Sequence, residues 1–127
     1  MKCLAAVLIS VSILGVSGAE AARIRYVGKA WSTQIRATQR NRLVLFQTAD
    51  PSQWTGTFRC WPLTPGARCL SPRASVSIHF LPNGQFEGSL GGTVCDAAGM
   101  GTPTSALNGS YSCVNGDRGT FYFRRIR

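Results

Sequence analysis

Acidic residues and histidine are scarce in this sequence, and their scarcity excludes most enzyme chemistry. The chain of 127 residues contains five acidic residues and one histidine. Acid–base catalysis and metal binding each need several such groups close together. The chain also has no Gly-x-Ser-x-Gly elbow, phosphate-binding loop or His-rich metal motif. We therefore expect no catalytic residues, no metal site and no cofactor, and we predict that the protein is not an enzyme.

His79 and Glu87 are the two residues that come nearest to an acid–base pair. They lie on the polar faces of two predicted strands, at nearly symmetric positions about the turn at Pro82–Gly84. Residues placed in this way become cross-strand neighbours in a hairpin. Because both side chains should face solvent rather than a pocket, we expect a surface pair with no catalytic role.

Long apolar runs are absent except at the start of the chain. Leu4–Val16 is an apolar run of 13 residues, which is too short to span a bilayer comfortably. Lys2 precedes it, and small residues follow at Ala19 and Ala21. This pattern predicts a secretory signal peptide over residues 1–21, cleaved after Ala21 or alternatively after Ala19, and Cys3 would be lost with it. Residues 22–127 should then form one exported domain, periplasmic or extracellular, without a membrane span.

Four cysteines remain after the predicted cleavage. They are Cys60, Cys69, Cys95 and Cys113. An even number of cysteines in an exported chain indicates two disulfides, and no pair has the spacing of a structural zinc site. Of the three possible connectivities we favour Cys60–Cys69 with Cys95–Cys113, because each bond then closes a short loop. A simple up-and-down meander conflicts with this pairing, since it places Cys113 at the end opposite the other three.

Three segments share a pattern that is typical of half-buried strands. Trp54–Cys60 and Leu107–Cys113 both alternate apolar and polar residues around a glycine, and Phe86–Leu90 repeats the first five positions. Side chains two apart share one face of a strand, so each segment has one face for the core and one for water. The inward glycines are Gly56, Gly88 and Gly109. They indicate sharp bends or a close backbone approach, with a ligand-lining role as the alternative.

About seven such short strands, separated by turn signals and without a convincing long helix, define the expected fold class. We predict an all-β domain, a small antiparallel barrel or sandwich stabilised by disulfides, with a last strand that pairs with an early one. Trp31–Asn41 could form either a short helix or an extended arm. Residues 61–73 should form a loop pinned by Cys69, and residues 96–106 should form an open loop without core content.

Positive charge is abundant and is concentrated near the start of the predicted domain. The net charge is +9, and twelve of the basic residues are arginine. Segment 22–42 holds six cations and no acid. Such a surface attracts anionic partners, although solubility alone is a simpler explanation. The candidate ligand-binding residues are Arg23, Arg25, Lys29, Arg36, Arg40, Arg42 and Trp61.

These observations favour a small exported binding module whose basic surface contacts an anionic or amphipathic ligand of the cell envelope. The alternative is a secreted protein–protein module, such as an inhibitor or an envelope accessory factor, that uses the 61–73 loop with Trp61 exposed. Nucleic acid is not an expected partner, and the oligomeric state is left open. The inward aromatic residues should fill the interior, which favours a surface site over an internal one. They are Trp54, Phe58, Phe80, Phe86, Tyr111, Phe121 and Phe123.

Overall fold

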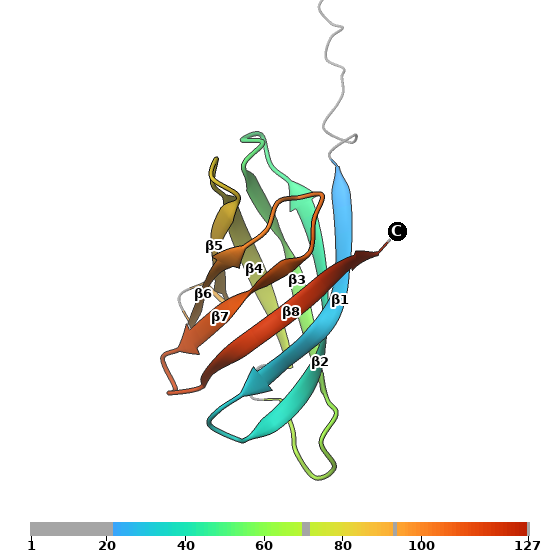
Figure 1. The fold of residues 1–127 in the computed structure, drawn as a ribbon, viewed down its shortest axis with the longest axis vertical. Helices are drawn as coiled ribbons and strands as arrows, with labels where there is room; N and C mark the ends of the chain where they lie inside the picture. The colour runs from blue at the N-terminus through green and yellow to red at the C-terminus, as the bar shows by residue number, and fades with distance from the viewer. Residues whose placement is uncertain (1–21, 70–71, 93, 127) are drawn as a thin grey trace, which may run out of the picture.

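Eight antiparallel strands form a closed barrel in which each strand pairs with the next and β1 pairs with β8 (Figure 1). The computed structural model describes residues 22–69, 72–92 and 94–126. The predicted signal peptide lies outside these residues. The strands are β1 (Arg23–Ser32), β2 (Ala37–Gln47), β3 (Gln53–Pro62), β4 (Arg73–Phe80), β5 (Gln85–Leu90), β6 (Cys95–Met100), β7 (Leu107–Cys113) and β8 (Arg118–Ile126).

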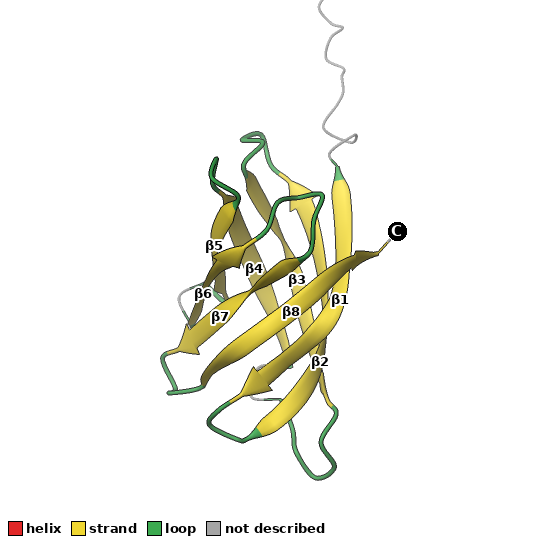
Figure 2. Ribbon diagram, viewed as in Figure 1, coloured by secondary structure: helices red, strands yellow, loops and turns green. Residues whose placement is uncertain are grey.

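The all-β class is confirmed, as a barrel of eight strands rather than about seven (Figure 2). Among the described residues, no helix is long and apolar enough to cross a membrane. Trp31–Asn41, for which the sequence allows a short helix or an extended arm, forms the end of β1, a turn and the start of β2. Because β1 pairs with both β2 and β8, this basic segment is part of the barrel wall.

The additional strand is β6, where the prediction of an open loop over 96–106 is wrong. Alanine and glycine are weak strand formers, yet Cys95–Met100 pairs along its whole length with both β5 and β7. Pairing on two sides outweighs the local preference here. The extra strand also reverses the chain once more, which brings Cys113 opposite Cys95. The favoured disulfides are therefore both confirmed, and their conflict with a simple meander disappears.

The two ends of the barrel differ. The β1–β2, β3–β4, β5–β6 and β7–β8 connections lie at one end, which faces down in Figure 1 and which we call the disulfide end. The Cys60–Cys69 and Cys95–Cys113 bonds both lie near it. The β2–β3, β4–β5 and β6–β7 connections lie at the opposite end of the barrel, together with the start of β1 and the end of β8. We call it the terminal end.

Large side chains pack the terminal half of the interior. Tyr26 and Leu45 are fully buried, and the rings of Trp54 and Phe80 meet edge to face with 6.4 Å between centroids. The Tyr26 hydroxyl donates to the carbonyl of Thr102, at 3.4 Å, in the β6–β7 connection. This cluster and its hydrogen bond close the barrel at the terminal end.

The other half of the interior is not filled, so the prediction of a completely filled aromatic core is wrong there. Phe58, Tyr111 and Phe121 point inward but remain only half-buried, because they border a cavity. The aromatic residues fill only one half of the interior of an eight-stranded barrel. The sequence predicts about seven strands, which would enclose a narrower interior. The extra strand widens the interior, since barrel diameter grows with strand number.

The inward glycines mark places where two backbones come very close. A Cβ atom built on Gly56 would lie 1.7 Å from the carbonyl oxygen of Val44. One built on Gly109 would lie 2.1 Å from the carbonyl oxygen of Ala98. No side chain fits at these distances, so the interpretation of these glycines as points of close approach in a strongly curved sheet is confirmed.

Candidate functional site

A row of arginines crosses the outer surface of the barrel on neighbouring strands. Arg42 of β2 lies directly opposite Arg59 of β3, and Arg59 lies opposite Arg73 of β4. All three side chains are exposed. Strands in a sheet are about 4.8 Å apart, so the row extends over roughly 10 Å. We call this surface, together with Arg40, Lys29 and Trp61 beside it, the arginine face.

Three arginine side chains lie around the ring of Trp61. Its ring centroid lies 5.3 Å from the Arg40 guanidinium carbon, 5.9 Å from that of Arg42 and 5.1 Å from that of Arg59. These distances are within the range of cation–π attraction. Arg40 lies opposite Trp61 on one side and opposite Lys29 on the other, so a second row of cations runs beside the first.

The arginine face has no acidic counterpart. Within the described ranges, the one ion pair joins His79 Nδ1 to Glu87 Oε2 at 3.9 Å, on β4 and β5. This is the predicted cross-strand pair, and it is confirmed as a surface contact with the two side chains 43% and 64% exposed. Like charges directly opposite each other destabilise a sheet. The arginine face therefore carries electrostatic repulsion that no acidic side chain in the described part of the chain relieves.

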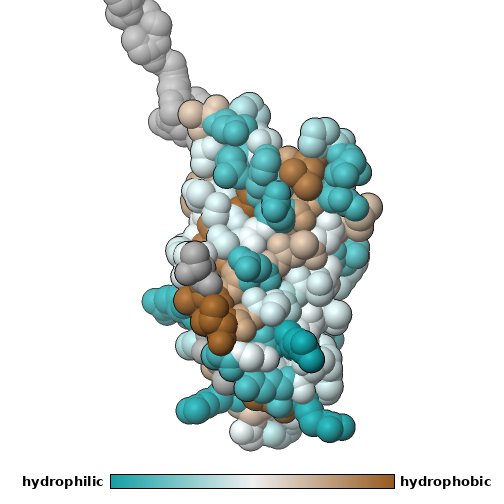
Figure 3. Space-filling model, turned by 90° about the vertical axis from the view of Figure 1, so that its left-hand side faces the viewer, coloured by the Kyte–Doolittle hydropathy of each residue, from teal (hydrophilic) through white to brown (hydrophobic). Residues whose placement is uncertain are grey.

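The other side of the barrel is chemically different. The outward residues of β5, β6 and β7 are mostly uncharged and polar, and Glu87 and Asp96 are the acids among them. Figure 3 shows this side, where much of the surface is pale and one strongly hydrophobic patch lies in the lower half. Of the other described acids, Asp50 lies in the β2–β3 turn and Asp117 is buried. Cations and acids are thus separated around the barrel.

The predicted ligand-binding residues are only partly brought together. Arg40, Arg42 and Trp61 meet, and Lys29 lies next to Arg40. Arg23 lies at the start of β1 near the terminal end, and Arg36 lies in the β1–β2 turn with a φ of 52°.

Arg25, the remaining candidate, lies on β1 opposite Val44, nearer the terminal end than Lys29. Trp61 is the one aromatic candidate, and the expectation that it is an exposed loop residue is wrong. It belongs to β3 and is half-buried, because cations stack against its ring.

Sequence reasoning missed Arg59 and Arg73. Arg59 was visible as an outward residue of a predicted strand, whereas Arg73 fell at the end of the predicted 61–73 loop, and neither belongs to the basic segment 22–42. Only the strand register places them beside Arg42. The available signal was the alternation of side chains between the two faces of a strand, which places Arg59 and Arg73 on the outer face together with Arg42.

Nothing in the described residues resembles a metal centre, since they contain no group of three or more His, Cys, Asp or Glu side chains that could hold an ion. The titratable groups with raised pKa values are two tyrosines. Burial raises the pKa of Tyr26 to about 12, and burial together with the charge of Asp117 raises that of Tyr111 to about 12. Both phenols stay protonated at neutral pH and act as hydrogen-bond donors.

The chain was compared with protein-family models, curated proteins and solved structures, and none of them matches it.

Proposed function

We propose that this protein is an exported binding protein whose arginine face docks onto an anionic component of the cell envelope. The observation that carries the proposal is the row formed by Arg42, Arg59 and Arg73, which are exposed and have no acidic partner in the described part of the chain. An anion placed over the row relieves the repulsion between these cations. Guanidinium groups also match phosphate and carboxylate in a two-point geometry.

The shape of the site favours a partner with several anionic groups. The backbones that carry the three guanidinium groups span roughly 10 Å, and Arg40 and Lys29 extend the face further, so several separate anionic groups can bind it at once. A layer of lipid headgroups that carry phosphate can contact them together, and basic residues are attracted to such a layer. Trp31 and Tyr122, which lie on β1 and β8, are 43% and 55% exposed. Aromatic side chains of this kind suit the boundary between headgroups and apolar tails.

Two further features support this proposal. The disulfides suit an oxidising compartment outside the cytosol, as the predicted signal peptide does. The alternative, a protein–protein module that presents Trp61 from a loop, loses its main feature because that ring is half-buried in β3. The binding proposal needs no catalytic group.

The test compares two double variants that lose the same charge at different places. Arg42→Ala/Arg59→Ala removes the centre of the arginine face. Arg23→Ala/Arg118→Ala removes two exposed arginines that lie near opposite ends of the barrel. Each protein is mixed with vesicles of phosphatidylcholine alone or with added phosphatidylglycerol, and the bound fraction is measured by sedimentation at increasing salt.

We expect wild type to bind the anionic vesicles with a strong salt dependence and to ignore the neutral ones. Each cation near an anionic surface contributes about 1 kcal/mol, so the face variant should lose about 2 kcal/mol, or roughly 30-fold in affinity. The control variant should lose clearly less. Equal losses in the two variants would show that net charge alone causes binding, and the proposed face would be wrong.

A further inference from the structure

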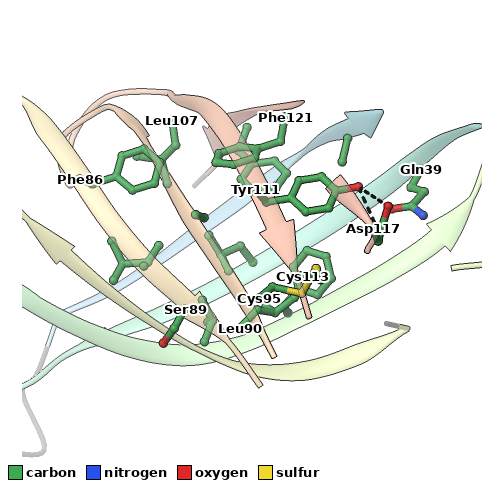
Figure 4. Close-up of a pocket in the computed structure, with 18 residues that line it drawn as sticks. Gln39, Phe86, Ser89, Leu90, Cys95, Leu107, Tyr111, Cys113, Asp117 and Phe121 are labelled. Atoms are coloured by element: carbon green, nitrogen blue, oxygen red, sulfur yellow. Dashed lines mark hydrogen bonds between the residues drawn. A yellow bond between two sulfur atoms is a disulfide. The ribbon is translucent and has the colours of Figure 1, made fainter. Parts of the chain in front are cut away.

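The barrel contains a partly open cavity of about 90 Å³ in its disulfide-end half (Figure 4). Its wall is predominantly apolar and comes from the inward faces of all eight strands, with the Cys95–Cys113 disulfide as part of it. The large apolar side chains that line it include Ile78, Phe86, Leu90, Leu107, Phe121 and Phe123. Protein interiors rarely leave a space larger than a water molecule, so a cavity of this size needs an explanation.

Small inward residues create this space. Ala30, Gly88 and Ala97 line the cavity, whereas the equivalent positions of the terminal half carry rings and long aliphatic chains. A Cβ atom on Gly88 would lie 2.9 Å from the carbonyl oxygen of Ser77, so a larger residue does not fit there. The cavity is therefore a consequence of which residues point inward on β1, β5 and β6.

One end of the cavity is polar. Asp117, which is 5% exposed, accepts hydrogen bonds from the hydroxyls of Ser32 and Tyr111, the latter at 3.3 Å to Oδ2. In Figure 4 the Tyr111 hydroxyl, Asp117 and Gln39 lie together at one side of the cavity, and Phe86 and Leu107 lie at the other. The site thus has an apolar body and a polar cap.

Two buried amides near this cap have unused hydrogen-bonding capacity. Gln39 lines the cavity, is 6% exposed and makes no side-chain hydrogen bond within the described residues. Asn41 is the next inward residue of β2, between Gln39 and the cavity-lining Leu43, and is 1% exposed. Neither its Oδ1 nor its Nδ2 has a hydrogen-bond partner among the described residues. Buried amides are almost always paired, and Gln39 is the one of the two that lines the cavity, so Gln39 points to a polar group that enters the barrel.

We propose that the cavity is a binding site for a small neutral molecule that has an apolar body and one hydroxyl or amide group, which pairs with Gln39. An apolar cavity of 150 Å³ accommodates benzene, so this one, of about 90 Å³, accommodates about four non-hydrogen atoms. The carboxylate of Asp117 repels an anion at the polar cap. The ligand class therefore differs from the anionic partner of the arginine face, and this inference does not rest on that proposal.

The probe is propan-1-ol, which has four non-hydrogen atoms, compared with 1-chloropropane, which has the same carbon chain but no hydrogen-bond donor. Backbone amide chemical shifts of the oxidised protein are recorded as each probe is added. We expect saturable shifts with a millimolar dissociation constant for the alcohol, confined to amides around the cavity such as those of Gly88, Ala97 and Leu107. The chloride should bind at least several-fold more weakly.

Neighbouring alanines on β6 provide a matched pair of variants. Ala97 points into the cavity, whereas Ala98 points outward and is exposed. Ala97→Leu should fill the cavity and abolish the saturable shifts, and Ala98→Leu should leave them unchanged. Gln39→Leu should remove the preference for the alcohol over the chloride. If Ala97→Leu does not fold, Ala30→Val serves as the filling variant.

Two results would overturn the proposal: shifts that never saturate in wild type, or the same saturable shifts in a folded filling variant. The variant Arg42→Ala/Arg59→Ala provides the link to the proposed function. It should bind the alcohol as wild type does, because its substitutions lie on the outside of the barrel. Absence of vesicle binding would therefore refute the proposed function alone, and absence of alcohol binding would refute the cavity proposal alone.

Discussion

Substitution of Gly109 gives the sharpest test of how the barrel is built. The perturbation is Gly109→Val, and the matched control is Ser110→Val, one residue further along β7. A Cβ atom on Gly109 would lie 2.1 Å from the carbonyl oxygen of Ala98 and 2.8 Å from the Cα of Gly99. Both neighbours are backbone atoms of the paired strand β6, so no side-chain rotation relieves the clash. Ser110 is exposed on the outer face, where valine has room and favours a strand.

The expected cost follows from this geometry. Overpacking inside a protein costs about 1–3 kcal/mol, and a clash with backbone belongs at the upper end of that range or above it. Exposed strand substitutions change stability by about 0.5 kcal/mol or less. A difference of about 2 kcal/mol corresponds to a difference in Tm of roughly 10 °C for a domain of this size. Thermal unfolding followed by circular dichroism measures it. Equal losses in the two variants, or a larger loss for Ser110→Val, would refute the assignment of Gly109 to a tightly curved inward face.

Two further predictions concern the disulfides and the tyrosines. Replacing Cys95 and Cys113, which are separated by 18 residues, with alanines should lower the free energy of unfolding by about 3 kcal/mol, and urea unfolding of the otherwise oxidised protein measures this loss. The pKa values of Tyr26 and Tyr111 are raised to about 12, whereas the unfolded phenols titrate near 10. Their contribution to stability is therefore complete below about pH 10 and is lost as the pH rises toward 12, so the urea midpoint should fall over that range and should fall less in Tyr111→Phe. A midpoint that does not change with pH there would contradict the burial of these hydroxyls.

Much of the barrel could be predicted because alternation and turn residues act locally. The strands around Trp54, Ile78 and Leu107 were identified from residues that alternate between core and solvent. The turn before β5 was identified from Asn83 and Gly84, and the glycine has the expected positive φ of 82°. These signals need no knowledge of neighbouring strands, so sequence reasoning finds them reliably.

The parts that could not be predicted depend on which strands are paired. Cys95–Met100 becomes a strand only because β5 and β7 lie on either side of it, and its own residues give no such signal. The contribution of Arg59 and Arg73 to the arginine face requires the register of three strands. The cavity requires the barrel diameter, which the additional strand changes. Each of these features arises from the sheet as a whole and not from a local segment.

Solubility alone does not require the arrangement of the arginine face. A net charge of +9 would keep the protein soluble wherever the cations were placed, but here Arg42, Arg59 and Arg73 lie directly opposite one another. Opposed like charges oppose folding, in a domain whose total stability is about 5–15 kcal/mol. The closed barrel and its two disulfides tolerate that cost. The residues on either side of Arg42 in β2 point into the core, whereas Arg42 itself points outward. The repelling charges therefore lie on the outer surface and do not disturb the core. A binding site for anions would require such destabilising cations to be held together on one surface, in a fold whose other features agree with one another.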